Sequence, residues 1–204
     1  MKGLSHIRSW FKGGLPSPPN ADESQIDGIT SIYFHEDDYC QIELVPSENE
    51  GYLIAQGAEI RRSAEKNFDG YGYKVIHVRS EEPVSLSTKG ITVEQMAEIL
   101  TAQGFLRIDI VYTGYSTHRE RAKDTVAFKL DPFVVYVDTK DGILAHAWLE
   151  LNWGASSESQ MCFIDALDHI GRKWQLLLSH WPGSRVVDLT DRAAIENYVT
   201  IDPQ

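Results

Sequence analysis

An aspartate-glycine turn between two apolar stretches constrains the fold of this chain more than any other feature. The stretches run from Phe133 to Val137 and from Ile143 to Leu151. Residues 138–142 join them and end in Asp141-Gly142, a pair that suits the positive φ angles of a tight hairpin turn. The pattern predicts an antiparallel β-hairpin over residues 133–151.

Two more pairs of apolar stretches are expected to form hairpins. The first pairs Ile29 to Phe34 with Tyr39 to Val45, and the acidic residues between them would form the turn. The second pairs Cys162 to Asp168 with Trp174 to His180. A helix is the alternative in this second region, because its apolar residues also fit a helical stripe, namely Met161, Ile164, Leu167 and Ile170.

A capping signal predicts a helix from Val93 to Gln103. Thr92 can accept a hydrogen bond from the third helical N–H group, Gln95 can reach back to the backbone of Thr92, and Gly104 provides a left-handed stop. Apolar spacing predicts a second helix over residues 52–68, and acidic and threonine caps predict a short third one over residues 191–198.

The remaining strand signals are single segments, at residues 73–78, 105–113, 125–130 and 186–187. The expected strands follow one another through hairpin turns and do not alternate regularly with helices, so a doubly wound dinucleotide-binding fold is not expected. We therefore expect an α+β domain with a mainly antiparallel β-sheet, built from hairpins, and two or three packed helices.

The first 24 residues differ in composition from the rest. The first 20 contain three basic residues and no acidic one, and residues 16–19 read Pro-Ser-Pro-Pro. We expect residues 1–24 to be a basic, proline-rich, flexible tail and residues 25–204 to be a single α+β domain. The alternative for the tail is contact with a membrane or a partner through residues at rough helical spacing, namely Leu4, Ile7, Trp10, Phe11 and Leu15.

The charge of the chain limits its partners. The 204 residues have a formal net charge of −11, and because the first 20 residues carry +3, the 184 residues that follow them carry −14. Nucleic acid binding needs positive potential, so we expect no nucleic acid partner, whereas a basic protein would be attracted. Cys40 and Cys162 form no CxxC motif and no apolar stretch approaches the roughly 20 residues that cross a bilayer, which favours a cytoplasmic location.

The acidic run from His35 to Asp38 is the candidate functional feature. Four adjacent titratable side chains are costly to bury, so they must lie at a surface, bind a cation or meet a basic partner. Adjacent residues of an extended chain point to opposite faces, which is poor geometry for a metal ion, and we expect no metal site. We predict that a basic protein partner binds a surface formed by Tyr33, His35, Glu36, Asp37, Asp38 and Tyr39.

Signals for catalysis are missing from the sequence, and we lean towards a protein that is not an enzyme. There is no Gly-x-Ser-x-Gly nucleophile elbow and no Gly-Lys-Ser/Thr phosphate-binding motif, so no catalytic residue and no cofactor are expected. Cys40 lies beside the acidic run, where negative charge disfavours the thiolate. The alternative is a metal-assisted or acid–base hydrolase that uses His35 and Asp37 with a distant histidine.

In general character, a compact acidic α+β chain of this kind resembles the bacterial immunity proteins that neutralise polymorphic toxins. The resemblance implies a cytoplasmic binding protein whose negatively charged surface covers the basic active site of a toxin. A membrane-peripheral scaffold component, anchored by the apolar residues of the first 24, is a further alternative.

Overall fold

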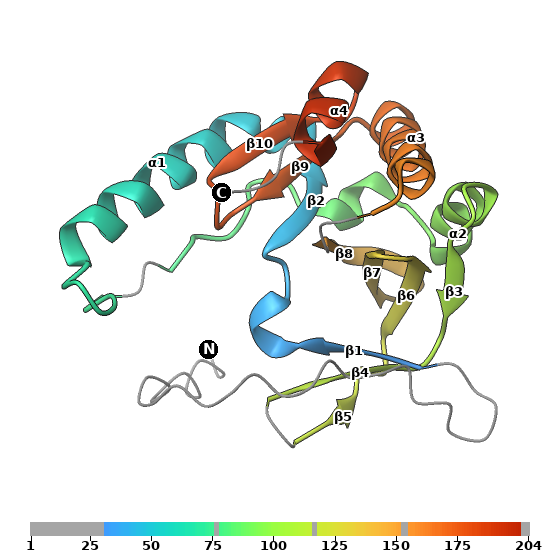
Figure 1. Ribbon diagram of the computed structural model, residues 1–204, viewed down its shortest axis with the longest axis horizontal. Helices are drawn as coiled ribbons and strands as arrows, with labels where there is room; N and C mark the ends of the chain where they lie inside the picture. Colours follow the sequence, from blue (N-terminus) through green and yellow to red (C-terminus); the bar gives the residue numbers. More distant parts are fainter. Residues whose placement is uncertain (1–30, 76–77, 116–117, 152–154, 201–204) are drawn as a thin grey trace.

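A seven-stranded antiparallel sheet is the largest element of the computed structural model, which describes residues 31–75, 78–115, 118–151 and 155–200 (Figure 1). The strands lie in the order β10-β9-β2-β8-β7-β6-β3, and every neighbouring pair is antiparallel. Their bounds are β2 (Ile42–Pro46), β3 (Leu106–Ile108), β6 (Thr125–Leu130), β7 (Phe133–Lys140), β8 (Ile143–Leu151), β9 (Leu176–His180) and β10 (Arg185–Asp188).

A smaller sheet has the strand order β1-β4-β5, in which β1 (Ile32–His35) is parallel to β4 (Val111–Gly114) and β5 (Glu120–Arg121) is antiparallel to β4. The α-helices of the described residues are α1 (Glu50–Asn67), α2 (Val93–Ala102), α3 (Ser157–Trp174) and α4 (Arg192–Thr200). Short 3₁₀ helices are η1 (Glu36–Asp38), η2 (Ser47–Asn49) and η3 (Leu86–Lys89). The α+β fold with mainly antiparallel strands is therefore confirmed.

The central hairpin is formed by β7 and β8, as the aspartate-glycine turn predicts. Asp141 and Gly142 have φ angles of 53° and 80° and are the two residues between the paired strands. Strand β8 has the predicted bounds, whereas β7 extends further into the predicted loop than expected, because residues 138–140 remain paired with β8.

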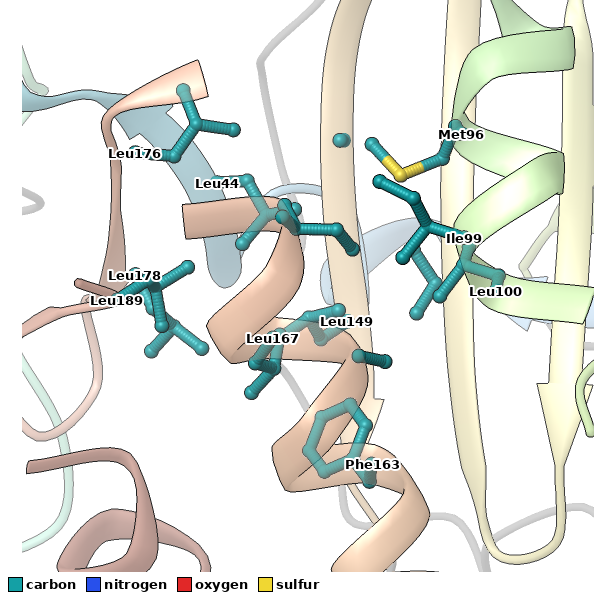
Figure 2. Packing of buried hydrophobic residues seen from close by; sticks show 14 of the residues in the cluster. Leu44, Met96, Ile99, Leu100, Leu149, Phe163, Leu167, Leu176, Leu178 and Leu189 are labelled. Carbon is teal, nitrogen blue, oxygen red and sulfur yellow. The ribbon is translucent and has the colours of Figure 1, made fainter. Parts of the chain in front are cut away.

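Helices α2, α3 and α4 pack on one face of the large sheet and enclose the main core. The predicted capping box is confirmed, since the side chain of Thr92 accepts from the N–H of Gln95 and the side chain of Gln95 accepts from the N–H of Thr92. Apolar side chains of α2, α3 and the sheet meet in this core (Figure 2), including Met96, Ile99, Leu100, Leu149, Phe163 and Leu167.

Two separate covers share the opposite face of the sheet. Helix α1 packs Leu53 against Val45 and Leu177, on strands β2 and β9. The smaller sheet packs Phe34 against Trp148, on strand β8. Figure 1 shows α1 and the β1-β4 pair as distinct units. Because side chains alternate along a strand, Glu43 lies on the same face as Val45, between the two covers.

Two of the predicted hairpins are wrong. Strand β1 pairs with β4, whereas β2 lies between β9 and β8, so the strands that flank the acidic run belong to different sheets. The expected strand from Cys162 to Asp168 is part of α3, which was the helix alternative. Helix α3 begins after Ser156, whose side chain accepts a hydrogen bond from the N–H of Ser159, and this cap favours a helix over a strand.

Two predicted strands differ in extent. Residues 105–113 divide into β3 and β4, which lie in different sheets. Residues 73–75 and 78 form no strand in the described part of the chain, apart from an isolated bridge between Phe68 and Tyr73, so that prediction is wrong. The predicted helices over 52–68 and 191–198 are confirmed as α1 and α4, and the predicted strands over 125–130 and 186–187 as β6 and β10.

The predicted tail, residues 1–24, lies outside the described residues, as do Ile29 and Thr30 of the first expected strand. The single domain over residues 25–204 therefore stays a prediction. None of the helices within the described ranges is both long and apolar enough to cross a membrane.

Candidate functional site

The acidic residues form a tight turn that carries the chain from the smaller sheet to the larger one. The Nδ1 atom of His35 accepts a hydrogen bond from the N–H of Asp37 at 3.2 Å, which starts η1. The N–H of Tyr39 donates to the carbonyl of Glu36 and closes the turn, and Cys40 follows with a φ angle of 53°. The run is thus a 3₁₀ turn rather than an extended segment with alternating faces.

The three carboxylates of this acidic turn, Glu36, Asp37 and Asp38, are all exposed. The Nδ1 atom of His35 lies 3.6 Å from Oδ2 of Asp37, but it accepts the hydrogen bond from the N–H of Asp37 and therefore carries no proton towards this carboxylate. Within the described ranges no lysine or arginine forms an ion pair with any of the three. The turn therefore presents concentrated negative charge to solvent.

Tyr33 is more enclosed than a free interface residue. Its hydroxyl donates to the carbonyl oxygen of Gly114 at 2.7 Å, and the guanidinium carbon of Arg119 lies 4.6 Å from its ring centre. The ring of His35 contacts the ring of Tyr115 at a centroid distance of 5.3 Å. Tyr33 and His35 thus contact the smaller sheet and the residues after it, and they hold the acidic turn in place. Arg119 places one positive charge beside Tyr33.

Tyr39 connects the turn to the central hairpin. Its hydroxyl donates to Oδ2 of Asp138 at 2.9 Å, and its ring lies 4.7 Å from that of Trp148. Burial, together with the neighbouring Cys40 and Asp138, raises the pKa of Tyr39 well above its usual value. The hydroxyl therefore stays protonated and remains a donor, while 37% of the residue is exposed.

A pocket of about 350 Å³ opens beside the acidic turn. Phe34 and Tyr39 contribute apolar wall, and Glu36 and Asp138 contribute carboxylates. Thr125 and Tyr39 donate hydrogen bonds to Asp138, but neutral donors leave the negative charge in place. We name this the acidic pocket; its chemistry suits a cationic side chain.

A metal or thiol chemistry finds less support in the geometry. No group of three or more histidine, cysteine, aspartate or glutamate side chains converges to hold a metal ion among the residues that the structure describes. Cys40 is buried, and burial first, then the charge of Glu43, raises the pKa of its thiol far above the usual value. The pKa of the Cys40 thiol is raised in the predicted direction, but burial is the main cause, and the carboxylates that add to it are Glu43 and Asp138, not those of the acidic turn.

A second polar cluster lies on the face of the large sheet between α1 and the smaller sheet. We call this region the seam. The carboxylate of Glu43, a residue only 6% exposed, accepts hydrogen bonds from Nη1 of Arg79 at 2.9 Å and from Nε1 of Trp181. The guanidinium carbon of Arg79 lies 4.1 Å from the centre of the Trp181 ring. A buried carboxylate with two charge-assisted donors is a fixed element of the seam.

Glu82 lies near this cluster, and the charges of Glu43 and Arg79 act on its carboxyl group. Burial and, after it, the charge of Glu43 raise the pKa of Glu82 to about 7, while the charge of Arg79 opposes the shift. The segment that carries Glu82 is held in place by Asn49, which is fully buried. The side chain of Asn49 accepts a hydrogen bond from the N–H of Val84 and donates one to the Val84 carbonyl at 2.7 Å.

Sequence reasoning missed Asp138 and the Glu43–Arg79–Trp181 cluster. Glu43 does carry a signal, because it interrupts the apolar residues Ile42, Leu44 and Val45 of a strand. Asp138 carries no such signal, because it falls in the predicted turn of residues 138–142, where aspartate is ordinary.

Comparison with protein-family models, curated proteins and solved structures gives no significant match for this chain.

Proposed function

We propose that this chain is a binding protein that holds a basic protein partner against its acidic turn, as an immunity protein holds a toxin. The observation that carries the proposal is the exposure of three consecutive carboxylates, Glu36, Asp37 and Asp38, with no lysine or arginine paired to them in the described part of the chain. Opposite charge on a partner would replace the missing cations and accelerate association.

The acidic pocket supports an anchoring role for one lysine or arginine side chain of the partner. Its carboxylates, Glu36 and Asp138, would bind the cationic head, and the rings of Phe34 and Tyr39 would contact the aliphatic or planar part. Interface energy concentrates in such partly enclosed sites, because the surrounding contacts exclude water.

The acidic turn is also held in place before any partner arrives. The bond from Tyr39 to Asp138 and the cap from His35 fix the backbone that carries the carboxylates. A fixed binding loop loses less conformational entropy on association than a mobile one, which favours affinity. We place the protein in the cytoplasm, where the free thiols of Cys40 and Cys162 would remain reduced.

Affinity purification from a native lysate tests the proposal. The baits are the unmodified full chain, a variant with Glu36→Lys, Asp37→Lys and Asp38→Lys, and a matched variant with Glu94→Lys, Glu98→Lys and Glu158→Lys, which reverses three exposed charges on α2 and α3. We expect a basic protein that the unmodified and matched baits retain and the turn variant loses. Equal recovery by all three baits would contradict the proposal.

A further inference from the structure

We propose that a groove beside α1 is a second binding site, for a small molecule with a planar apolar body and one anionic group. The groove lies between α1, the segment that carries Tyr73 to Val75, and the loop that follows β9 at Trp181. It is separate from the acidic turn, so the two proposals stand or fall independently.

The size of the groove fits a small molecule. Its volume is about 400 Å³, and small-molecule pockets commonly measure about 300–1,000 Å³. A hollow of this size accommodates a bicyclic aromatic compound rather than a folded protein segment.

Part of its wall is apolar and incompletely covered. Tyr73 and Val75 are 60% and 57% exposed, and they line the groove together with Ile60 of α1 and Trp181. Single exposed apolar side chains are ordinary on a protein surface, but several that line one hollow indicate a site for an apolar ligand. A planar body placed there would remove these side chains from water.

The charge of the groove selects an anion. Arg61 and Arg79 both line it, and none of the described lining residues is acidic, although the chain as a whole has a net charge of −11. Arg79 is paired with Glu43, so Arg61 supplies the unbalanced charge. Nη1 of Arg61 donates to the carbonyl of Ser184 at 3.3 Å, and none of the ion pairs among the residues that the structure describes involves Arg61.

Arg79 gives the groove a planar surface whose position is fixed by its neighbours. Its Nη1 is bound to the buried carboxylate of Glu43, and its guanidinium lies against the ring of Trp181. The side chain of Arg79 is still 32% exposed, so part of this planar group faces the groove. Guanidinium and aromatic planes stack on flat ligands, and a preformed plane costs little entropy to bind.

Two fluorescent dyes with the same aromatic frame test the proposal on the full chain. Anilinonaphthalene sulfonate carries an anionic group, and phenylnaphthylamine lacks it. We expect the sulfonate to bind the folded protein with one site and the neutral dye to bind about tenfold more weakly, a difference of about 1.4 kcal/mol. Equal affinity for the two dyes, or no binding of the sulfonate, would overturn the inference.

Adjacent arginines of α1 provide the matched variants. Arg61 lines the groove, whereas Arg62 is exposed and bonds to the carbonyl of Ala58 on its own helix. We expect Arg61→Gln to weaken the sulfonate about tenfold and to leave the neutral dye unchanged, and Arg62→Gln to change neither. Val75→Asp, at an exposed wall position, should also weaken the sulfonate. If Arg61→Gln and Arg62→Gln behave alike, the site is not the groove.

Discussion

The hydroxyl of Tyr39 donates a hydrogen bond to Oδ2 of Asp138 at 2.9 Å and thereby ties the acidic turn to the central hairpin across 99 residues of sequence. Tyr39→Phe keeps the ring contacts and removes this bond, so we expect a loss of about 1 kcal/mol in the free energy of unfolding, measured in urea. Tyr71→Phe is the control, because Tyr71 is fully exposed. Equal effects of the two changes would show that the bond stabilises nothing.

Local signals in the sequence predict the helices and strands of this fold better than they predict which strands pair with one another. The turn at Asp141-Gly142 and the capping box at Thr92 act within a few residues, and both are confirmed. The pairing of β1 with β4 joins residues such as Ile32 and Val111, which no local pattern relates. Apolar alternation indicates a strand but leaves its neighbour open, so the sheet order could not be predicted.

In the candidate site, too, the sequence predicts local properties but not the contacts that the fold creates. The charge of Glu36, Asp37 and Asp38 made exposure predictable, because burial of adjacent carboxylates is costly. The roles of Asp138 and Arg79 depend on contacts with Tyr39 and Glu43 that only the fold creates. Sequence reasoning therefore located the acidic turn but could not find the acidic pocket or the groove.

Arg79 is expected to stabilise the seam because it is paired with a buried carboxylate. Arg79→Ala leaves Glu43 buried with only the Trp181 donor, and we expect a loss of about 2 kcal/mol in unfolding free energy. Arg107→Ala serves as the comparison, since its pair with Asp109 is on the surface at 2.8 Å and should cost less than about 1 kcal/mol. A loss at Arg79 no larger than that at Arg107 would contradict the role of the buried pair.

The raised pKa of Glu82 gives the fold a defined pH dependence. The folded protein holds this proton up to about pH 7, whereas the unfolded chain releases it near the ordinary value of 4.5. The stabilising contribution is therefore fully present below pH 4.5 and is lost as the pH rises towards 7. Urea unfolding across this range should show a decline in stability that Glu82→Gln reduces. The neighbouring change Glu81→Gln, at an exposed residue, should leave the decline intact.

Gly171 permits the close approach of α3 to the residue that follows β10. A Cβ atom at this position would collide with the backbone oxygen and Cβ of Leu189, which is fully buried. We expect Gly171→Ala to lower the unfolding free energy by about 1–3 kcal/mol, as for other overpacked cores. Gly51→Ala, in the first turn of α1 where nothing lies within 4 Å, should be neutral or stabilising. Unchanged stability of Gly171→Ala would mean that α3 can move away at no cost.

The most direct test of the central claim is a titration of the full chain with a fluorescent oligo-arginine peptide, followed by anisotropy at low salt. The turn variant carries Glu36→Gln, Asp37→Asn and Asp38→Asn, and the matched variant carries Glu94→Gln, Glu98→Gln and Glu158→Gln on the helices of the opposite face of the sheet. We predict that the turn variant binds the peptide about tenfold more weakly and that the matched variant stays within about twofold of the unmodified protein. If both variants weaken binding equally, the attraction belongs to the net charge and the acidic turn is not a binding site.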